Sequence, residues 1–133
     1  MAEQQMPRVP ITLTVNGKTF AGWLQSSVRR SIEALAGTFD VPVALVPGTV
    51  PEIKRQDEVS VRIGQTVLVT GYVLSADPFY SRDDCGLRIM GRDRSGDLAV
   101  CAAIHKGGQW RNATLERIVK DLVHPYGITV RNE

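Results

Sequence analysis

The sequence predicts a mainly β fold with short helices: a small antiparallel barrel or sandwich, followed by an amphipathic helix and a short strand. Apolar and polar residues alternate in several short stretches between residues 11 and 90, and turn-forming residues separate these stretches. The pattern indicates roughly five to seven strands without the strand-helix alternation of a parallel sheet. Near the C-terminus one segment has a helical period instead.

Length and composition indicate one folded unit of ordinary globular make-up. The chain has 133 residues, of which 43% are hydrophobic and 23% charged, and a chain of this size buries roughly two-thirds of its unfolded surface. No run approaches the roughly 20 apolar residues of a membrane span, and the first ten residues lack the basic and apolar regions of a secretion signal. We therefore expect no membrane insertion, and a protein made in the cytoplasm with two free thiols.

The first strands form a hairpin. Apolar and polar residues alternate over 11–15, and the turn-forming pair Asn16-Gly17 follows directly. Both residues tolerate the positive φ angles of a tight hairpin turn, so Leu13 should pair with Phe20 on a strand returning to about Trp23.

The next segment is ambiguous and then becomes a strand. Residues 28–36 fit either a short helical turn or a strand, and Gly37 ends them. Alternation resumes over 39–45, where Pro42 confines the strand to an edge or a bulge. Residues 46–57 are rich in proline and charge, which is typical of a loop.

A second hairpin covers residues 59–74. Gly64-Gln65 suits a type II′ turn, and Val61 and Leu68 are predicted to pair and to share one core with the first hairpin. Gly71 inside the returning strand indicates a bulge or a close backbone approach.

Residues 76–84 are predicted to be a long exposed tip, and a short strand follows over 87–90. The stretch 91–98 (GRDRSGDL) then suits a strand end at Gly91 and a turn. Ser95 or Asp97 would cap a short helix.

The helical segment is residues 115–123, whose apolar residues recur at i, i+3, i+4, i+7 and i+8. Asn112 or Thr114 can cap its first turn, and Pro125 with Gly127 ends it before a short strand at 127–130. His124 would act at the helix C-terminus as a favourable charge.

Candidate catalytic and metal-binding groups are few. Cys101 and His105 are four residues apart, as a thiolate pair or two metal ligands on a helix would be, but the apolar surroundings favour Cys101 as a small core residue. The acidic residues Asp77, Asp83 and Asp84 lack the spacing of a calcium loop. The chain carries no phosphate-binding motif, so we expect no catalytic residue, cofactor or metal.

The charge points to an assembly surface. Sixteen basic and 14 acidic residues give a net charge of +2, too balanced for a typical nucleic-acid binder. Arginine far outnumbers lysine, and arginine is enriched in protein interfaces. The alternative is a small β-barrel that binds single-stranded nucleic acid, with stacking candidates Trp23, Tyr72, Phe79, Tyr80 and Trp110.

Five segments together resemble Mu-like phage baseplate hub proteins, relatives of late-control D proteins and of the hub part of type VI secretion spikes. In order they are VNGKTFAGW, VRRSIEALAGTFDV, VSVRIGQTVLVTGYV, GRDRSGDLAVCAA and WRNATLERIVKDLVHPYGITV. The resemblance runs from about residue 10 to the end and corresponds to the N-terminal portion of that family, whose members are generally more than twice as long.

The resemblance implies a virion structural protein of a contractile tail, without catalysis. It implies a homotrimer in the full-length context, joining the tail tube to the central spike, with DNA passing through the lumen without specific binding. Residues 1–9 would be a flexible N-terminus, 10–108 an incomplete tube-like β-barrel and 109–133 the start of a second domain. The candidate interface residues are Arg29, Arg30, Arg92 and Arg94.

Overall fold

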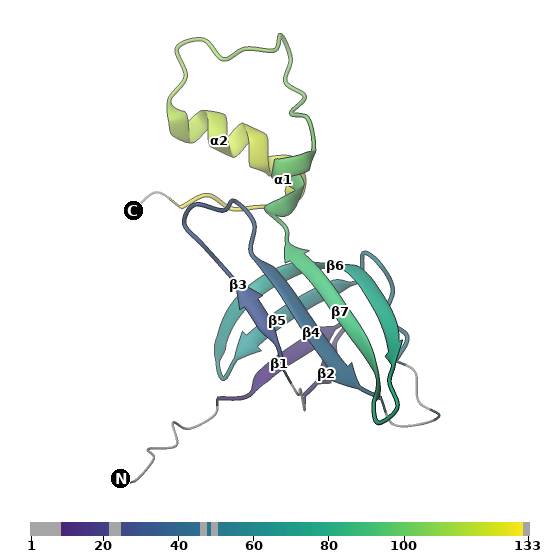
Figure 1. Cartoon of the computed structure of the whole chain (residues 1–133). Coiled ribbons are helices and arrows are strands. Elements are labelled where there is room, and N and C mark those ends of the chain that lie inside the picture. Colours follow the sequence, from purple (N-terminus) through teal and green to yellow (C-terminus); the bar gives the residue numbers. More distant parts are fainter. Residues whose placement is uncertain (1–8, 22–24, 46–47, 49–50, 132–133) are drawn as a thin grey trace.

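The computed structural model describes residues 9–21, 25–45, 48 and 51–131 (Figure 1). One seven-stranded antiparallel sheet has the order β2-β1-β5-β6-β7-β4-β3. Its strands are β1 (Ile11–Val15), β2 (Lys18–Phe20), β3 (Ser27–Arg29), β4 (Thr38–Ala44), β5 (Glu58–Ile63), β6 (Thr66–Tyr80) and β7 (Cys85–Asp93). The sheet curls so that β4 and β7 lie across from β1 and β5 (Figure 1), but β2 and β3 remain its two edges. The mainly β fold is confirmed, as an open curled sheet and not a closed barrel.

The first hairpin matches its prediction. Leu13 pairs with Phe20, and the turn residues Asn16 and Gly17 have φ angles of 48° and 80°. The predicted end of the returning strand, Trp23, lies outside the described residues. For the segment 28–36, which could be a helical turn or a strand, the structure shows a strand only at its start, in β3. Residues 30–37 form neither helix nor strand.

The second hairpin forms, but its predicted register is wrong. Gly64 has the positive φ of 55° that the turn requires, whereas Val61 pairs with Val69 and not with Leu68. A bulge between Val61 and Arg62 inserts one extra residue in β6. The pairs next to the turn keep the predicted register, and the pairs farther from the turn are shifted by one residue. Leu68 still packs against the core, as Phe20 does, although both are only partly buried.

The predicted long tip at 76–84 is also wrong. β6 continues through Tyr80, paired with β7, and only residues 81–84 form the turn. Pro78 is tolerated because β5 pairs with β6 only as far as Tyr72, so β6 has a single neighbour beyond that point. For the same reason Pro42 fits in β4, since β3 pairs with β4 only through Asp40.

The C-terminal part lies beyond the end of β7 (Figure 1). It contains α1 (Gly96–Val100), α2 (Leu115–Val123) and the 3-10 turn η1 (His124–Tyr126). The predicted helix is confirmed at α2, where the Thr114 hydroxyl accepts a hydrogen bond from the Arg117 backbone N–H at 3.3 Å. The predicted strand at 127–130 does not form, because no strand of the described sheet pairs with it.

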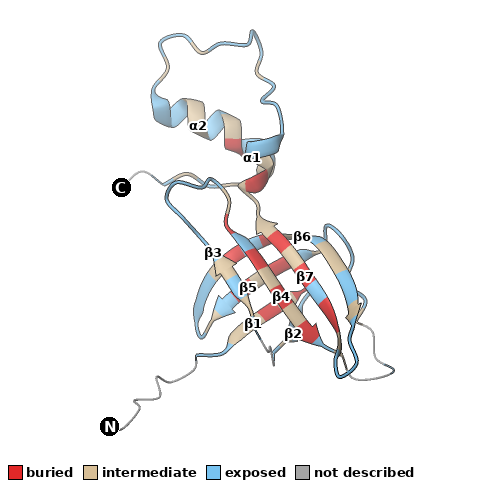
Figure 2. Cartoon of the chain, in the orientation of Figure 1, coloured by how far each residue is buried: buried red, intermediate tan, exposed pale blue. Residues whose placement is uncertain are grey.

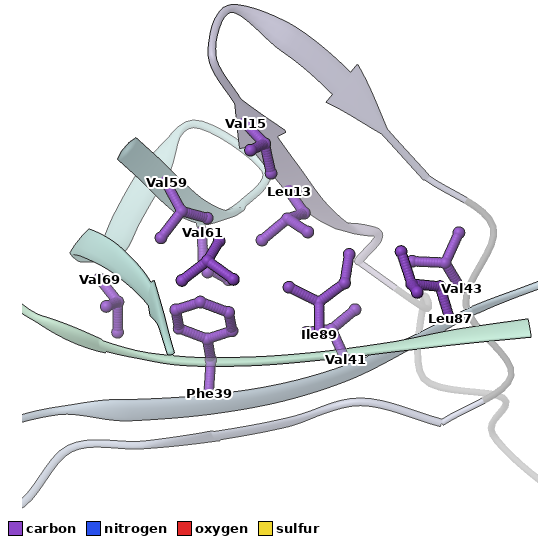
Figure 3. Close-up of a cluster of buried hydrophobic side chains, with 11 residues drawn as sticks. Leu13, Val15, Phe39, Val41, Val43, Val59, Val61, Val69, Leu87 and Ile89 are labelled. Atoms are coloured by element: carbon purple, nitrogen blue, oxygen red, sulfur yellow. The ribbon is translucent and has the colours of Figure 1, made fainter. Parts of the chain in front are cut away.

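One apolar core fills the inside of the curled sheet. Figure 2 shows its buried residues along the strands, and Figure 3 shows their side chains converging from the two halves of the sheet. The core cluster consists of Leu13, Val15, Phe39, Val41, Val43, Val59, Val61, Val69, Val73, Leu87 and Ile89. No polar or charged side chain is buried among the described residues. No helix of the described chain is long and apolar enough to span a membrane.

Candidate interface residues

The turn between β7 and α1 clamps a distant segment onto the sheet. The Asp93 backbone N–H donates to the Gly37 carbonyl at 3.0 Å, and the Asp93 carboxylate accepts from the Gly37 N–H at 2.7 Å. The Ser95 hydroxyl contacts both the Leu35 carbonyl and the Asp93 carboxylate. Ser95 is the N-cap residue of α1 as predicted, but its side chain holds this clamp instead of capping the helix. β7 extends to Asp93, past the strand end predicted at Gly91.

Two of the four candidate interface arginines serve internal contacts. Arg92 donates to the Asp97 carboxylate at 3.1 Å, and Gly96 leaves the room that the Arg92 side chain occupies, because an added Cβ would lie 2.5 Å from its Cδ. Arg94 donates to Glu58 at 3.0 Å. Its guanidinium carbon lies 5.7 Å from the centre of the Tyr72 ring, within cation-π range. These contacts brace α1 and the turn against the sheet.

Arg29 and Arg30 face solvent. Both are exposed, and neither forms an ion pair with any residue that the structure describes. They follow one another at the end of the edge strand β3. Of the four candidates they are the two without an ion pair to a described residue, and their interface role stays a prediction.

A forked ion pair lies on the outer face of the sheet. Arg88 donates from Nε to one Asp40 oxygen at 2.9 Å and from Nη2 to the other. The hydrogen bonds, more than the charge itself, hold the pKa of Asp40 below its usual value. The same contact raises the pKa of Arg88, to which Asp77 adds a smaller attraction. This geometry joins β4 to β7 and fixes two charges on one surface.

Cys101 and His105 do not form a reactive pair. α1 ends at Val100, so the two residues do not share a helix. The expectation that Cys101 is a core residue is wrong, because Cys101 is exposed. Burial and then a hydrogen bond with Cys101 raise the pKa of Tyr126. His105 instead stacks on Trp110 with ring centres 4.1 Å apart. His124, the C-cap residue of α2, is exposed at the predicted helix end.

Potential ligands for a metal are also dispersed. Among the described residues, no three His, Cys, Asp or Glu side chains come close enough to hold an ion. In the turn that follows β6, the Asp84 backbone is hydrogen-bonded to Ser81, which closes the turn. The expectation of no metal or cofactor stays a prediction.

The candidate stacking aromatics are scattered. Tyr72 lies under Arg94, Phe79 packs onto Gly86, and Trp110 donates to Asp121 beside its stack with His105. Tyr80 is mostly exposed, and Trp23 lies outside the described residues. These contacts do not build one platform for successive bases, and nothing favours the nucleic-acid alternative.

Sequence reasoning missed an exposed apolar set at the α1 end of the molecule. Ile32, Val100 and Ile104 are 104%, 65% and 100% exposed, and Leu35 and Leu115 are also exposed. Monomers carry single exposed apolar residues freely, whereas several near one end are typical of a contact surface. Two of these residues, Ile32 and Leu35, lie in the segment 28–36, whose apolar residues fit both a helical and a strand period. That ambiguity was the one signal of this surface in the sequence.

Comparisons with known proteins agree along most of the chain. The model of the family "Mu phage baseplate assembly protein GpP-like, N-terminal" matches residues 10–93, and that of "Baseplate hub protein gp44-like, second domain" matches residues 95–133. The baseplate hub protein gp44 of Escherichia phage Mu is 42% identical over 124 residues, covering 92% of this chain and 33% of that protein. The chain therefore spans about a third of this relative's length.

Solved structures show the same fold. The 43 kDa tail protein of prophage MuSo2 from Shewanella oneidensis superposes with a TM-score of 0.82 at 31% identity, covering 90% of this chain and 38% of that one. The tail protein from Neisseria meningitidis MC58 superposes with a TM-score of 0.74 at 23% identity, over 86% of this chain and 33% of that one, and this likeness concerns the fold alone. The predicted family is confirmed: the chain belongs to the Mu-like baseplate hub proteins, of which it corresponds to the N-terminal portion.

Proposed function

We propose that this chain is the N-terminal part of a contractile-tail baseplate hub that links the tail tube to the central spike. The observation that carries the proposal is the succession of the two family matches, over 10–93 and then 95–133. A 42% identity to a relative named baseplate hub protein supports it. The role is structural and the protein acts in the virion tail, after synthesis in the host cytoplasm.

The architecture suits a building block whose working surfaces are extended. Its core is apolar and filled from five strands, while both edge strands, β2 and β3, are only three residues long. Short edges limit uncontrolled strand pairing, and the open sheet leaves room for further strands. In the full-length hub, segments outside this chain would complete the barrel, with residues 10–108 as its first part and 109–133 opening the second domain.

The assembly would be a homotrimer in the full-length protein. Three copies, each with two tube-like barrels, present six similar units to a sixfold tube and three to a threefold spike. DNA would pass through the lumen without specific binding. We assign the exposed residues Arg29 and Arg30 to contacts between proteins.

A chimeric phage tests this function. The segment of the phage Mu hub gene that aligns with this chain is replaced by this sequence, and tails are examined by negative-stain electron microscopy. Intact contractile tails with three chimeric chains per particle, counted by quantitative mass spectrometry, are the expected result. A folded chimera that is absent from tail particles would contradict the proposal, as would particles that form equally well without it.

A further inference from the structure

A cleft of about 340 Å³ lies between the loop before β5, the middle of β6 and the joint of β7 with α1. Its walls carry two arginines from distant parts of the chain, Arg55 and Arg92, together with Tyr72 and Asp97. No comparison or motif described above assigns a role to this cleft. Sequence reasoning placed Arg55 in a loop and gave it no function.

The loop that carries Arg55 is fixed to the sheet. The Gln56 N–H donates to the Val73 carbonyl at 2.7 Å, and the Val73 N–H donates to the Asp57 carbonyl at 3.0 Å. The Asp57 carboxylate also accepts from the Lys54 N–H at 2.8 Å. These bonds hold the backbone on both sides of Arg55, so the base of its side chain is fixed at the wall of the cleft.

The arginines in the cleft have unused hydrogen-bonding capacity. Arg55 has no ion pair with any described residue, and Arg92 pairs only with Asp97 within the same part of the chain. A guanidinium offers five N–H donors, and Asp97 takes one of those on Arg92 at 3.1 Å. Two cations and one carboxylate leave the lining with one excess positive charge.

Partial burial strengthens the attraction between this positive charge and an anion. The Arg92 side chain is only 25% exposed, so an anion beside it is less screened by water than at an open surface. The Tyr72 ring forms an aromatic wall of the cleft. Arg94 lies over this ring and is already paired with Glu58. Arginine and tyrosine around a partly desolvated pocket are the composition of an interface hot spot.

We propose that this cleft binds a carboxylate: it receives an aspartate or glutamate side chain of a partner protein in the baseplate. The forked guanidinium matches a carboxylate through two parallel hydrogen bonds, and the cleft has the volume for one side chain. That the ligand is a carboxylate is inferred from the lining of the cleft. That the carboxylate belongs to a baseplate protein rests on the proposed function.

Binding is measured on the isotope-labelled chain by NMR, following the arginine Nε–Hε signals. The probe is acetyl-Gly-Glu-Gly-amide, its neutral match is acetyl-Gly-Gln-Gly-amide, and inorganic phosphate is the third arm. We expect the glutamyl peptide to shift the Arg55 and Arg92 signals in a saturable way, and the glutaminyl peptide to leave them unchanged. Equal shifts with both peptides, or saturation with phosphate alone, would overturn the proposal.

Three variants sharpen the test. Arg55→Gln should weaken binding of the glutamyl peptide by about tenfold, because it removes a charge-assisted contact. Arg62→Gln is the matched control: Arg62 is exposed on β5 with no ion pair to a described residue, and its loss should leave affinity unchanged. Asp97→Asn should tighten binding severalfold, since it removes the competing carboxylate.

The opposite signs expected for Arg55→Gln and Asp97→Asn separate a binding role from a loss of structure. Equal affinities for Arg55→Gln and Arg62→Gln would refute the site. Peptide binding needs no phage, so it can succeed where the chimera fails to assemble, which would reject the hub function and keep the cleft. A chimera with Arg55→Gln that still assembles, together with a peptide that does not bind, would reject the cleft alone.

Discussion

Gly71 of β6 lies against the backbone of β7, and its replacement by alanine tests the packing of the sheet. A Cβ at this position would lie 2.0 Å from the Arg92 carbonyl oxygen and 2.5 Å from the Asp93 Cα, far inside the roughly 3.5 Å of a favourable contact. Both neighbours are backbone atoms, so no side-chain rotation relieves the clash and the two strands must separate.

The expected loss follows from two contributions. Overpacking costs roughly 1–3 kcal/mol, and separating the strands weakens bonds such as that from the Arg94 N–H to the Thr70 carbonyl, 3.2 Å long, worth about 1 kcal/mol each. Gly71→Ala should therefore lower the free energy of unfolding by about 2–4 kcal/mol, or the melting temperature by roughly 10–20 °C.

Urea denaturation followed by far-UV circular dichroism measures this change. The matched control is Thr70→Ala, the adjacent and exposed position on β6, which should change stability by only about 0.5 kcal/mol. Failure of Gly71→Ala to fold while Thr70→Ala folds normally would agree with the reasoning. Equal denaturation midpoints for the two variants would refute the close approach of β7.

Three further measurements test the core, the outer face and the interface. Phe20→Ala should lower the free energy of unfolding by about 1–2 kcal/mol in the same assay, below the roughly 3–5 kcal/mol of a fully buried phenylalanine, because Phe20 is only partly buried; a loss at the higher value would contradict that placement. Asp40 should titrate below its usual pKa of 3.8 in a carboxyl-carbon NMR titration, and Arg88→Gln should raise that pKa. Since the folded-state pKa is the lower one, the ion pair contributes stability above the unfolded pKa and loses it as the pH falls through the folded value; an unchanged Asp40 pKa in Arg88→Gln would show that the pair does not form. In the chimeric phage, Arg29→Glu should abolish intact tails while the protein stays folded, whereas Cys101→Ala should be harmless; normal tails with the first variant and none with the second would reverse the assignment of an assembly surface.

Local signals in the sequence were sufficient for several elements. Asn16-Gly17 specifies a turn through the φ angles its residues tolerate, and α2 follows from the period and the Thr114 cap. For Gly71 the sequence allowed a bulge or a close backbone approach, and the structure shows the close approach. In each case the physical cause lies within a few residues, or in the absence of a side chain, and is visible without the fold.

The predictions failed where contacts with segments distant in the sequence determine the local structure. The bulge after Val61 changes the register without any change of alternation that a sequence pattern reveals. The strand at 76–80 contains Asp77 and Pro78, which indicate a turn, yet β7 supplies hydrogen bonds on the one side where Pro78 does not interfere. Cys101 sits in an apolar run but is exposed, because the chain leaves α1 before that run can pack on the sheet.

The sequence by itself determined the mainly β class, the two hairpin turns, the α2 helix and the resemblance to baseplate hubs. The tertiary structure alone decided the sheet order, the clamp between Gly37 and Asp93, which are 56 positions apart, and the cleft that brings Arg55 near Arg92. Turns and helix periods depend on the conformations of neighbouring residues. Clamps and clefts depend on strand pairings between distant segments, because only the packed sheet brings such residues together.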